Sequence, residues 1–309
     1  MAGSGTCRRF LLIGGMPRSG TTLVQTIIGS HSRIAIPPGD FPYAERAVTG
    51  LSVEKIFAIF RKKETWKLWA VQDFSSTFSL DHGAAYRSTL IRYADALGKD
   101  IPGAKAPFSE FYLDQYEDWL SGDELRFLYM VRNPFDTLSS LKHSHIHKGW
   151  QNFEDLLDVH AHNWLRSVSI ALARQRFDPE RFLVLRYEDL VNAPAQHGEA
   201  ICRFVGVDFE EASMLNRSDY AYHDTNTSFP EQYAARPDKT RYIYAAQSRK
   251  NALTGAEIEK IGRLCGEVAV SLGYADPDFV ASPPGQPERL NLPTRTRRLA
   301  RRVLRRLKR

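Results

Sequence analysis

Residues 10–24 join a short apolar run, a glycine-bearing loop and the start of an amphipathic segment. This order predicts a buried strand, a tight loop and a helix, the arrangement with which a helix N-terminus binds phosphate. Gly15 and Gly20 have the spacing of the pattern G-x-x-x-x-G-K-[ST], but Thr21 stands where that pattern has the lysine that contacts nucleoside triphosphates. The cation of the loop is Arg18 instead. We therefore expect a nucleotide ligand whose transferable group is not an ordinary γ-phosphate.

The composition is that of an ordinary globular protein. Of 309 residues, 43% are apolar and 25% are charged, and no apolar run approaches the roughly 18 residues of a membrane span. The three cysteines have no C-x-x-C spacing, so neither a disulfide framework nor a zinc site is indicated. We expect a protein of the reducing cytoplasm.

Apolar runs and amphipathic segments alternate along residues 1–275, which predicts an α/β domain with a central parallel sheet flanked by helices. The expected strands are 10–14, 34–36, 125–131 and 181–186, and the expected helices are 21–30, 52–63, 83–97, 108–120, 134–147, 153–176, 194–205 and 254–272. Trp66, Trp69, Phe74 and Phe78 form an aromatic-rich connection. Core packing is favoured for these side chains, with an acceptor pocket as the alternative.

Basic charge is concentrated at the C-terminal end. Residues 276–293 read as a proline-rich linker, and residues 294–309 hold nine Lys or Arg and no acid. The remaining 33 basic residues stand against 36 acidic ones, so the body of the chain is near neutral and is not expected to bind nucleic acid. The last segment has the pattern of a basic amphipathic helix, for which a membrane surface, an acidic partner and a solvated tail all remain open.

Three separated motifs occur along the chain, at residues 17–22, 131–140 and 186–190. Taken together, they resemble motifs of sulfotransferases that use 3′-phosphoadenosine-5′-phosphosulfate (PAPS). Pro17-Arg-Ser-Gly-Thr-Thr22 is similar to their 5′-phosphosulfate loop, P-[KR]-S-G-T-T. Val131-Arg-Asn-Pro-Phe-Asp-Thr-Leu-Ser-Ser140 resembles their 3′-phosphate strand and helix, and Arg186-Tyr-Glu-Asp-Leu190 resembles a later strand end. Lys105-Ala-Pro107 matches the K-x-P element of the branch with bacterial and protein-tyrosine sulfotransferases. The resemblance spans residues 10–275 and implies the sulfotransferase fold, with its P-loop-like sheet.

The resemblance implies a donor site built from these motifs. Arg18 would neutralise charge on the leaving 5′-phosphate, Arg132 and Ser140 would bind the 3′-phosphate, and Tyr187 would lie near the nucleotide. Two alternatives are an Arg132 paired with Asp136 and a Ser140 that faces water. The donor-binding residues that the resemblance implies are Pro17, Arg18, Ser19, Gly20, Thr21, Thr22, Arg132, Ser140, Tyr187 and, by a looser match, Ser248, Arg249 and Lys250.

The resemblance also implies residues for the transfer step. Lys105 would bridge the transferred sulfate and the acceptor, unless it is an exposed strand-end lysine. Pro107 occupies the place of the histidine base in the cytosolic branch, whereas the protein-tyrosine and carbohydrate branches use a glutamate after the second strand. Asp40 is the nearest equivalent, with Glu45 as its rival. A helix cap for a helix near residue 42 is the structural alternative for Asp40.

The sequence thus predicts a PAPS-dependent sulfotransferase acting on a hydroxyl acceptor, such as a small molecule, a glycolipid or a sugar. A P-loop kinase or ATPase and a non-catalytic, membrane-associated nucleotide adaptor are the alternatives. No metal is expected, because a sulfuryl group carries less charge than a phosphoryl group. His143, His145 and His147 would fan around a helix, which disfavours a metal site. Neither the acceptor nor the oligomeric state can be inferred.

Overall fold

One parallel sheet lies at the centre of the fold. The computed structural model describes residues 7–142, 153–215 and 253–276. Within these residues the strand order is β2-β3-β1-β4-β5, and neighbouring strands are parallel. The strands are β1 (Arg9–Gly15), β2 (Ile34–Ala35), β3 (Ile101–Lys105), β4 (Glu124–Val131) and β5 (Phe182–Arg186).

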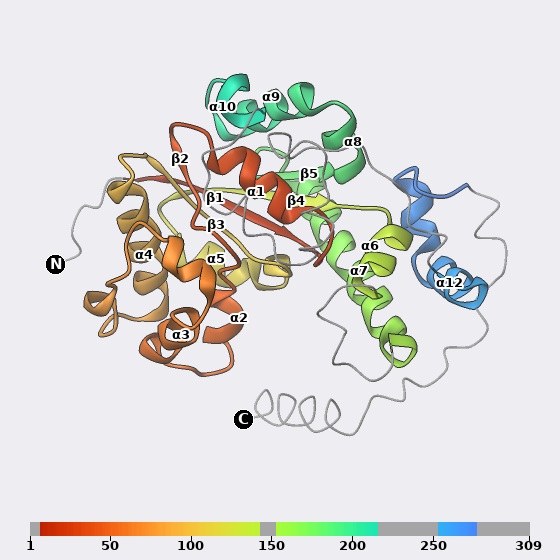
Figure 1. Ribbon diagram of the computed structural model, residues 1–309, viewed down its shortest axis with the longest axis horizontal. Coiled ribbons are helices and arrows are strands. Elements are labelled where there is room, and N and C mark those ends of the chain that lie inside the picture. Colours follow the sequence, from red (N-terminus) through yellow and green to blue (C-terminus); the bar gives the residue numbers. More distant parts are fainter. Residues whose placement is uncertain (1–6, 143–152, 216–252, 277–309) are drawn as a thin grey trace.

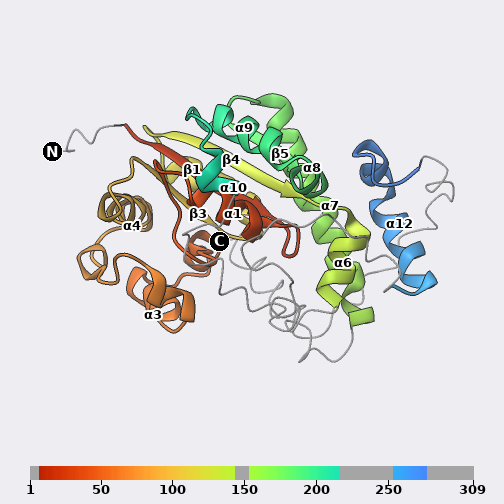
Figure 2. The same cartoon turned by 45° about the horizontal axis from the view of Figure 1, so that its top comes forward.

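Helices follow or connect the strands throughout the described chain. They are α1 (Thr21–Gly29), α2 (Tyr43–Ala47), α3 (Val53–Phe60), α4 (His82–Ala96), α5 (Leu113–Trp119), α6 (Pro134–Lys142), α7 (Phe153–Phe177), α8 (Tyr187–Asn192), α9 (Pro194–Val205), α10 (Glu211–Leu215) and α12 (Gly255–Ser271), with 3₁₀ turns η1 (Glu64–Leu68), η2 (Ser75–Thr77) and η3 (Ser109–Tyr112). Figures 1 and 2 show α3 and α4 at one end of the molecule and α6 and α12 at the other.

Alternation along the central strand divides the core into two layers. Phe10 and Leu12 of β1 pack in a cluster with side chains of α3, α4, α5 and α7. Leu11 and Ile13 pack in a second cluster with α1, α8, α9 and α10. Because successive side chains of a strand point to opposite faces, these two sets of helices cover opposite faces of the sheet, as Figure 1 shows. The predicted fold class is confirmed.

The strand order places the end of β1 at the centre of the carboxyl edge. After β1 the chain forms β2 and β3 on one side and then crosses to β4 and β5 on the other. Ligands of open α/β sheets bind where the direction of winding changes, outside the carboxyl ends of the strands. Gly15, Lys105 and Val131, which end β1, β3 and β4, therefore mark the region of the site.

Several predicted elements are corrected by the structure. The segment predicted as one helix over 108–120 is a 3₁₀ turn followed by α5, because the backbone of Tyr112 (φ −123°, ψ 23°) departs from helical geometry between them. The short helices α8 and α10 and the strand β3 are not among the predicted elements. Strands or helices of five or six residues offer too few repeats for periodicity to identify them.

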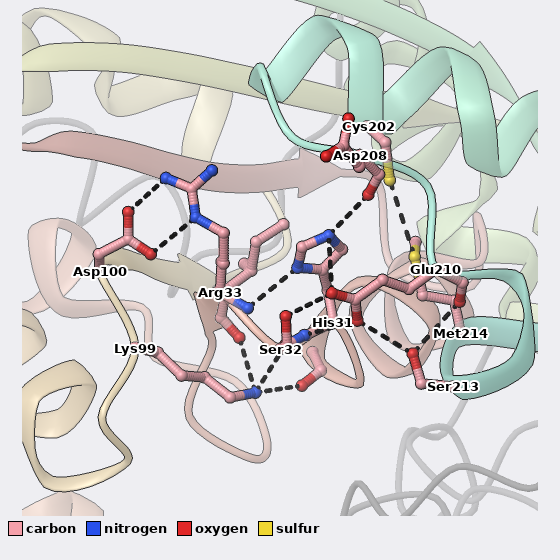
Figure 3. A network of polar contacts seen from close by, with 12 residues as sticks. His31, Ser32, Arg33, Lys99, Asp100, Cys202, Asp208, Glu210, Ser213 and Met214 are labelled. Carbon is pink, nitrogen blue, oxygen red and sulfur yellow. Dashed lines mark hydrogen bonds and ion pairs between the residues drawn. The ribbon is translucent and has the colours of Figure 1, made fainter.

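A network of polar contacts fastens the C-terminal end of α1 to its neighbours (Figure 3). Lys99 Nζ donates to the carbonyl oxygens of Gly29, His31 and Ile34 at 3.1, 2.8 and 3.1 Å. His31 Nδ1 accepts from the Arg33 amide at 3.0 Å, so its other ring nitrogen carries the proton and donates to the Asp208 carbonyl at 2.8 Å. Lys99 thus satisfies the Gly29 carbonyl, one of those that a helix end leaves unpaired.

Replacing Lys99 by methionine should lower the free energy of unfolding by about 1–3 kcal/mol, because half-buried carbonyls lose a charged donor. Burial lowers the pKa of the Lys99 amino group, and Glu210 partly opposes this shift. The charged amino group is therefore costly to bury, and its hydrogen bonds to the three carbonyl groups offset that cost. Urea unfolding would measure the change. Lys67→Met, at an exposed lysine paired with Glu64, is the control. Equal stabilities of the two variants would contradict the prediction.

Candidate active site

The loop between β1 and α1 leaves a helix N-terminus uncapped by any side chain. Gly20 is the N-cap residue of α1, with φ 99°, and no side-chain hydrogen bond caps the helix. Arg18 also adopts a left-handed backbone (φ 74°), a strained conformation for a residue with a Cβ. The first amide groups of α1 have no partner within the helix, and the helix dipole adds positive potential at this end. The loop therefore has the properties of an anion site.

Two buried polar atoms at this loop fit an oxyanion ligand. Among the described residues, Ser19 Oγ and Arg132 Nε are buried and have no hydrogen-bond partner. Buried polar groups are almost always paired, so each requires an acceptor or donor from elsewhere. A phosphate oxygen supplies acceptors for both. The residues present thus fit a nucleotide phosphate.

The two arginines predicted for different phosphates lie side by side. Arg18 Nε donates to Ser140 Oγ at 3.2 Å, and Arg132 Nη1 donates to the carbonyl oxygen of Arg18 at 3.3 Å. The Arg132 guanidinium lies over the Tyr187 ring, 4.4 Å from its centroid. The same ring packs on Gly20, where an added Cβ would be 2.4 Å from Tyr187 Cδ2. Ser140 is 2% exposed, so the alternative in which it faces water is wrong.

The loop that carries Asp40 is fixed from two sides. Gln25, on α1, donates from Nε2 to the carbonyl oxygens of Pro37 and Gly39 at 2.8 and 3.0 Å. Trp69 Nε1 donates to the carbonyl oxygen of Pro38 at 3.1 Å. Gly39 has φ 87° and packs on Thr65, which leaves no room for a side chain. The loop conformation is therefore determined jointly by α1 and by the aromatic-rich connection.

Asp40 and Lys105 form an ion pair beside the start of α1. Lys105 Nζ donates to Asp40 Oδ1 and, at 3.3 Å, to Thr22 Oγ1. The Phe41 amide donates to the Lys105 carbonyl oxygen at 2.8 Å, and Lys63 Nζ donates to the Asp40 carbonyl oxygen at 3.3 Å. The Lys105 side chain is 1% exposed and the Asp40 side chain 42% exposed. A buried ammonium and an accessible carboxylate thus meet next to the anion site.

These contacts decide two of the alternatives left by the sequence. Lys105 is not an exposed strand-end lysine. Asp40 is not a helix cap, because α2 has Pro42 as its N-cap residue and no side-chain cap. Glu45, the rival base, lies within α2.

Aromatic side chains of the connection belong to the core. Trp66, Trp69 and Phe74 are buried to 6% exposure or less and pack with Phe57 in one aromatic cluster. The core interpretation is confirmed for these three, and they offer no accessible wall to an acceptor. Their contribution to the site is indirect, through the Trp69 hydrogen bond to the Asp40 loop.

Sequence reasoning missed two residues that shape the site. Gln25 lies among the apolar residues of the first helix and is fully buried. A polar residue next to the sheet-facing positions of a helix is the sequence feature that could have indicated its role. Lys63 follows α3, and burial lowers the pKa of its amino group while Asp40 opposes that shift. Nothing in its sequence context distinguishes Lys63 from the neighbouring Lys62.

Some predicted residues lie outside the described residues. These are Ser248, Arg249 and Lys250, the histidines 143, 145 and 147, the linker 276–293 beyond its first residue, and the basic tail 294–309. Within the described ranges, no group of three or more His, Cys, Asp or Glu is arranged to bind a metal. No helix in those same ranges is long and apolar enough to cross a bilayer.

Comparison with known proteins identifies relatives of the chain. The family model described as "Sulfotransferase family" matches residues 11–211. Mouse carbohydrate sulfotransferase 4 is 28% identical over 95 residues, which is 31% of this chain and 24% of that protein. The chain thus aligns with about a quarter of the length of this curated relative.

Two solved structures share the fold. The sulfotransferase domain from the Synechococcus PCC 7002 olefin synthase has a TM-score of 0.60 and 19% identity, covering 88% of this chain and 96% of that one. The sulfotransferase domain from the curacin biosynthetic pathway has a TM-score of 0.53 and 18% identity, covering 88% of this chain and all of that one.

Proposed function

The chain belongs to the sulfotransferase family, and on that premise we propose that it transfers a sulfuryl group from PAPS to the hydroxyl group of an acceptor. Family membership favours this reaction over the kinase, ATPase and adaptor alternatives. The observation that carries the proposal is the Lys105 ammonium, which contacts both Thr22 at the anion site and Asp40 outside it. One cation thus lies between the place for a donor and the place for an acceptor.

The donor would be held at both of its phosphates. The amide groups at the start of α1, Ser19 Oγ and the hydroxyl groups of Thr21 and Thr22 suit the 5′-phosphate. Arg132 and Ser140 suit the 3′-phosphate, and the Tyr187 ring packs against the Arg132 guanidinium. Pro17 and Gly20 shape the loop, and Ser248 to Lys250 remain predicted contacts.

Transfer forms a bond between the acceptor oxygen and sulfur and breaks the bond between sulfur and the 5′-phosphate oxygen. The electron pair of the broken bond stays with adenosine 3′,5′-bisphosphate (PAP), so negative charge develops on that phosphate. Arg18 and Lys105 would stabilise this charge, which is the kind of fixed electrostatic contribution that accelerates group transfer most. The acceptor proton would pass to the Asp40 carboxylate.

Replacing Asp40 by asparagine should lower kcat by about 10²-fold or more, because an amide cannot accept the acceptor proton. The asparagine keeps an oxygen for Lys105, so the affinity for PAP should change little. Steady-state kinetics and calorimetry with PAP separate the two effects. Glu45→Gln is the matched variant, and a larger loss of kcat in it than in Asp40→Asn would make Glu45 the base instead.

The proposed reaction is tested by transfer of radiolabelled sulfate from PAPS into acceptors of a cell extract. We expect labelled product with the wild-type protein and none with Arg18→Ala. Product from neither protein, although the wild type binds PAP, would contradict the transfer proposal. Product that depends on magnesium and ATP rather than on PAPS would favour the kinase alternative.

The acceptor class stays a proposal. A hydroxyl group on a small molecule, a glycolipid or a sugar fits an accessible carboxylate beside a buried ammonium. A membrane surface as a partner of residues 294–309, and a cytoplasmic location, are predictions from the sequence.

A further inference from the structure

A buried carboxyl group lies beneath the phosphate loop and has no part in the proposed reaction. Glu110, in the 3₁₀ turn η3, is 2% exposed. Its Oε2 accepts from the Gly15 amide at 3.1 Å, and its Oε1 accepts from the Ser167 hydroxyl of α7. Ser167 also shares a hydrogen bond of 2.7 Å with the Tyr129 hydroxyl of β4. Both carboxyl oxygens therefore have partners, one of which is the first glycine of the loop.

This carboxyl group is costly to keep buried. Burial raises the pKa of Glu110 to about 7, against the opposing effect of its hydrogen bonds from Ser167 and Gly15. The titratable groups that face it are Tyr116 of α5 and Tyr129 of β4, whose own pKa values it helps to raise. Within residues 7–142, 153–215 and 253–276, Glu110 forms no ion pair, so a salt bridge does not explain why this carboxyl group is buried.

Gly15 is held at both of its backbone polar groups by one short segment. The Phe108 amide donates to the Gly15 carbonyl oxygen at 3.0 Å, and Glu110 accepts from the Gly15 amide. The segment begins three residues after Lys105. Gly15 also lies against Ser19, whose Oγ would be 2.9 Å from a Cβ at this glycine. A displacement of Gly15 would therefore move the loop residues that face the donor.

We propose that Glu110 is a positioning residue of the donor site, whose carboxyl group fixes Gly15 and thereby holds the phosphate loop in register with Lys105. The inference rests on the proposed function, in which this loop binds the 5′-phosphate of the donor. Glu110 touches neither donor nor acceptor in this arrangement. Its effect reaches them through the backbone of Gly15.

Two substitutions separate hydrogen bonding from simple filling of space. Glu110→Gln keeps an acceptor for Gly15 and offers a donor to Ser167, whereas Glu110→Leu keeps a similar volume and loses both. We expect Glu110→Leu to weaken PAP binding about tenfold or more and to raise KM for PAPS more than it lowers kcat. Glu110→Gln should restore the affinity to within about threefold of the wild type. Calorimetry with PAP, on protein shown to be folded by circular dichroism, measures the affinities.

The control is Glu117→Gln, which weakens ion pairs with Arg174 and Arg181 away from the loop. It should leave the affinity for PAP unchanged. Wild-type affinity in folded Glu110→Leu would overturn the inference alone. Absence of PAP binding by the wild type would remove the proposed function and this inference with it.

A spectroscopic test does not depend on Glu110→Leu folding. An amide proton that donates to a carboxylate resonates downfield of one that donates to a neutral amide oxygen, because the charged acceptor polarises it more. At pH 9, above the pKa of about 7, the Gly15 amide proton of the wild type should therefore lie downfield of that in Glu110→Gln. Coincident Gly15 resonances in the two proteins would overturn the inference.

Discussion

Replacing Lys105 by methionine is expected to lower kcat for sulfate transfer by about 10²–10³-fold, the usual cost of removing one preorganised charge stabiliser. The Lys105 ammonium is buried at the end of β3 and contacts Thr22 and Asp40, so no solvent cation can take its place. Methionine is unbranched and has nearly the same length, which limits repacking. The affinity for PAP should stay within a few-fold of the wild type, since the amide groups at the start of α1 are unchanged.

Steady-state kinetics and calorimetry with PAP would measure both quantities. Lys67→Met is the control, because Lys67 has a 70% exposed side chain and pairs with nearby Glu64. Lys105→Arg should not rescue transfer, since a planar guanidinium is larger and directs its donors differently from an ammonium. A kcat within threefold of the wild type for Lys105→Met would show that this cation does not act on the transferred group.

Replacing Arg132 by leucine is expected to weaken PAP binding about 10²-fold while leaving the affinity for adenosine 5′-phosphate nearly unchanged. A charge-assisted, bidentate contact with a phosphate is worth several kcal/mol, and each 1.4 kcal/mol is about tenfold in affinity. The Arg132 guanidinium is held over Tyr187 and has a buried Nε with no hydrogen-bond partner in the described chain. The guanidinium is therefore placed to bind the 3′-phosphate, which PAP carries and adenosine 5′-phosphate lacks.

Calorimetry with both nucleotides tests the discrimination, and Arg203→Leu, at an exposed arginine paired with Glu199, is the control. The two affinities also distinguish two roles of Arg132. Arg132 Nη1 also donates to the carbonyl oxygen of Arg18, so Arg132 supports the 5′ loop as well. Equal losses for the two nucleotides would mean that this support, and not recognition of a 3′-phosphate, is its contribution.

The order of elements was predictable because it depends on local patterns. Helix α9 begins at Pro194 and ends at Val205 as predicted, since proline suits a first turn and Gly206 adopts the left-handed conformation of a helix end. Thr254 caps α12 through a capping box with Glu257, which fixes the last described helix to within a residue of its predicted bounds. Short elements such as α8 could not be predicted, because five or six residues are too few to show a helical period.

The site was predictable only in part, for a similar reason. Motif residues that contact phosphate must follow one another along the chain, so Arg18 to Thr22 could be recognised together. Gln25, Lys63 and Glu110 act on backbone groups of distant segments, at sequence separations that no local pattern encodes. Burial of Lys105 likewise follows from the sheet order, which places β3 next to β1.

Helix α1 has a consequence for inhibitors that imitate both reactants at once. Its first turn faces the anion site, and Gln25, in its second turn, donates hydrogen bonds to the loop that carries Asp40. The donor subsite and the acceptor subsite are therefore both held by α1. Neither can shift relative to the other without breaking buried hydrogen bonds. A compound that tethers an adenosine phosphate to an acceptor mimic should accordingly bind well at one tether length, and lose affinity steeply when a single methylene is added or removed.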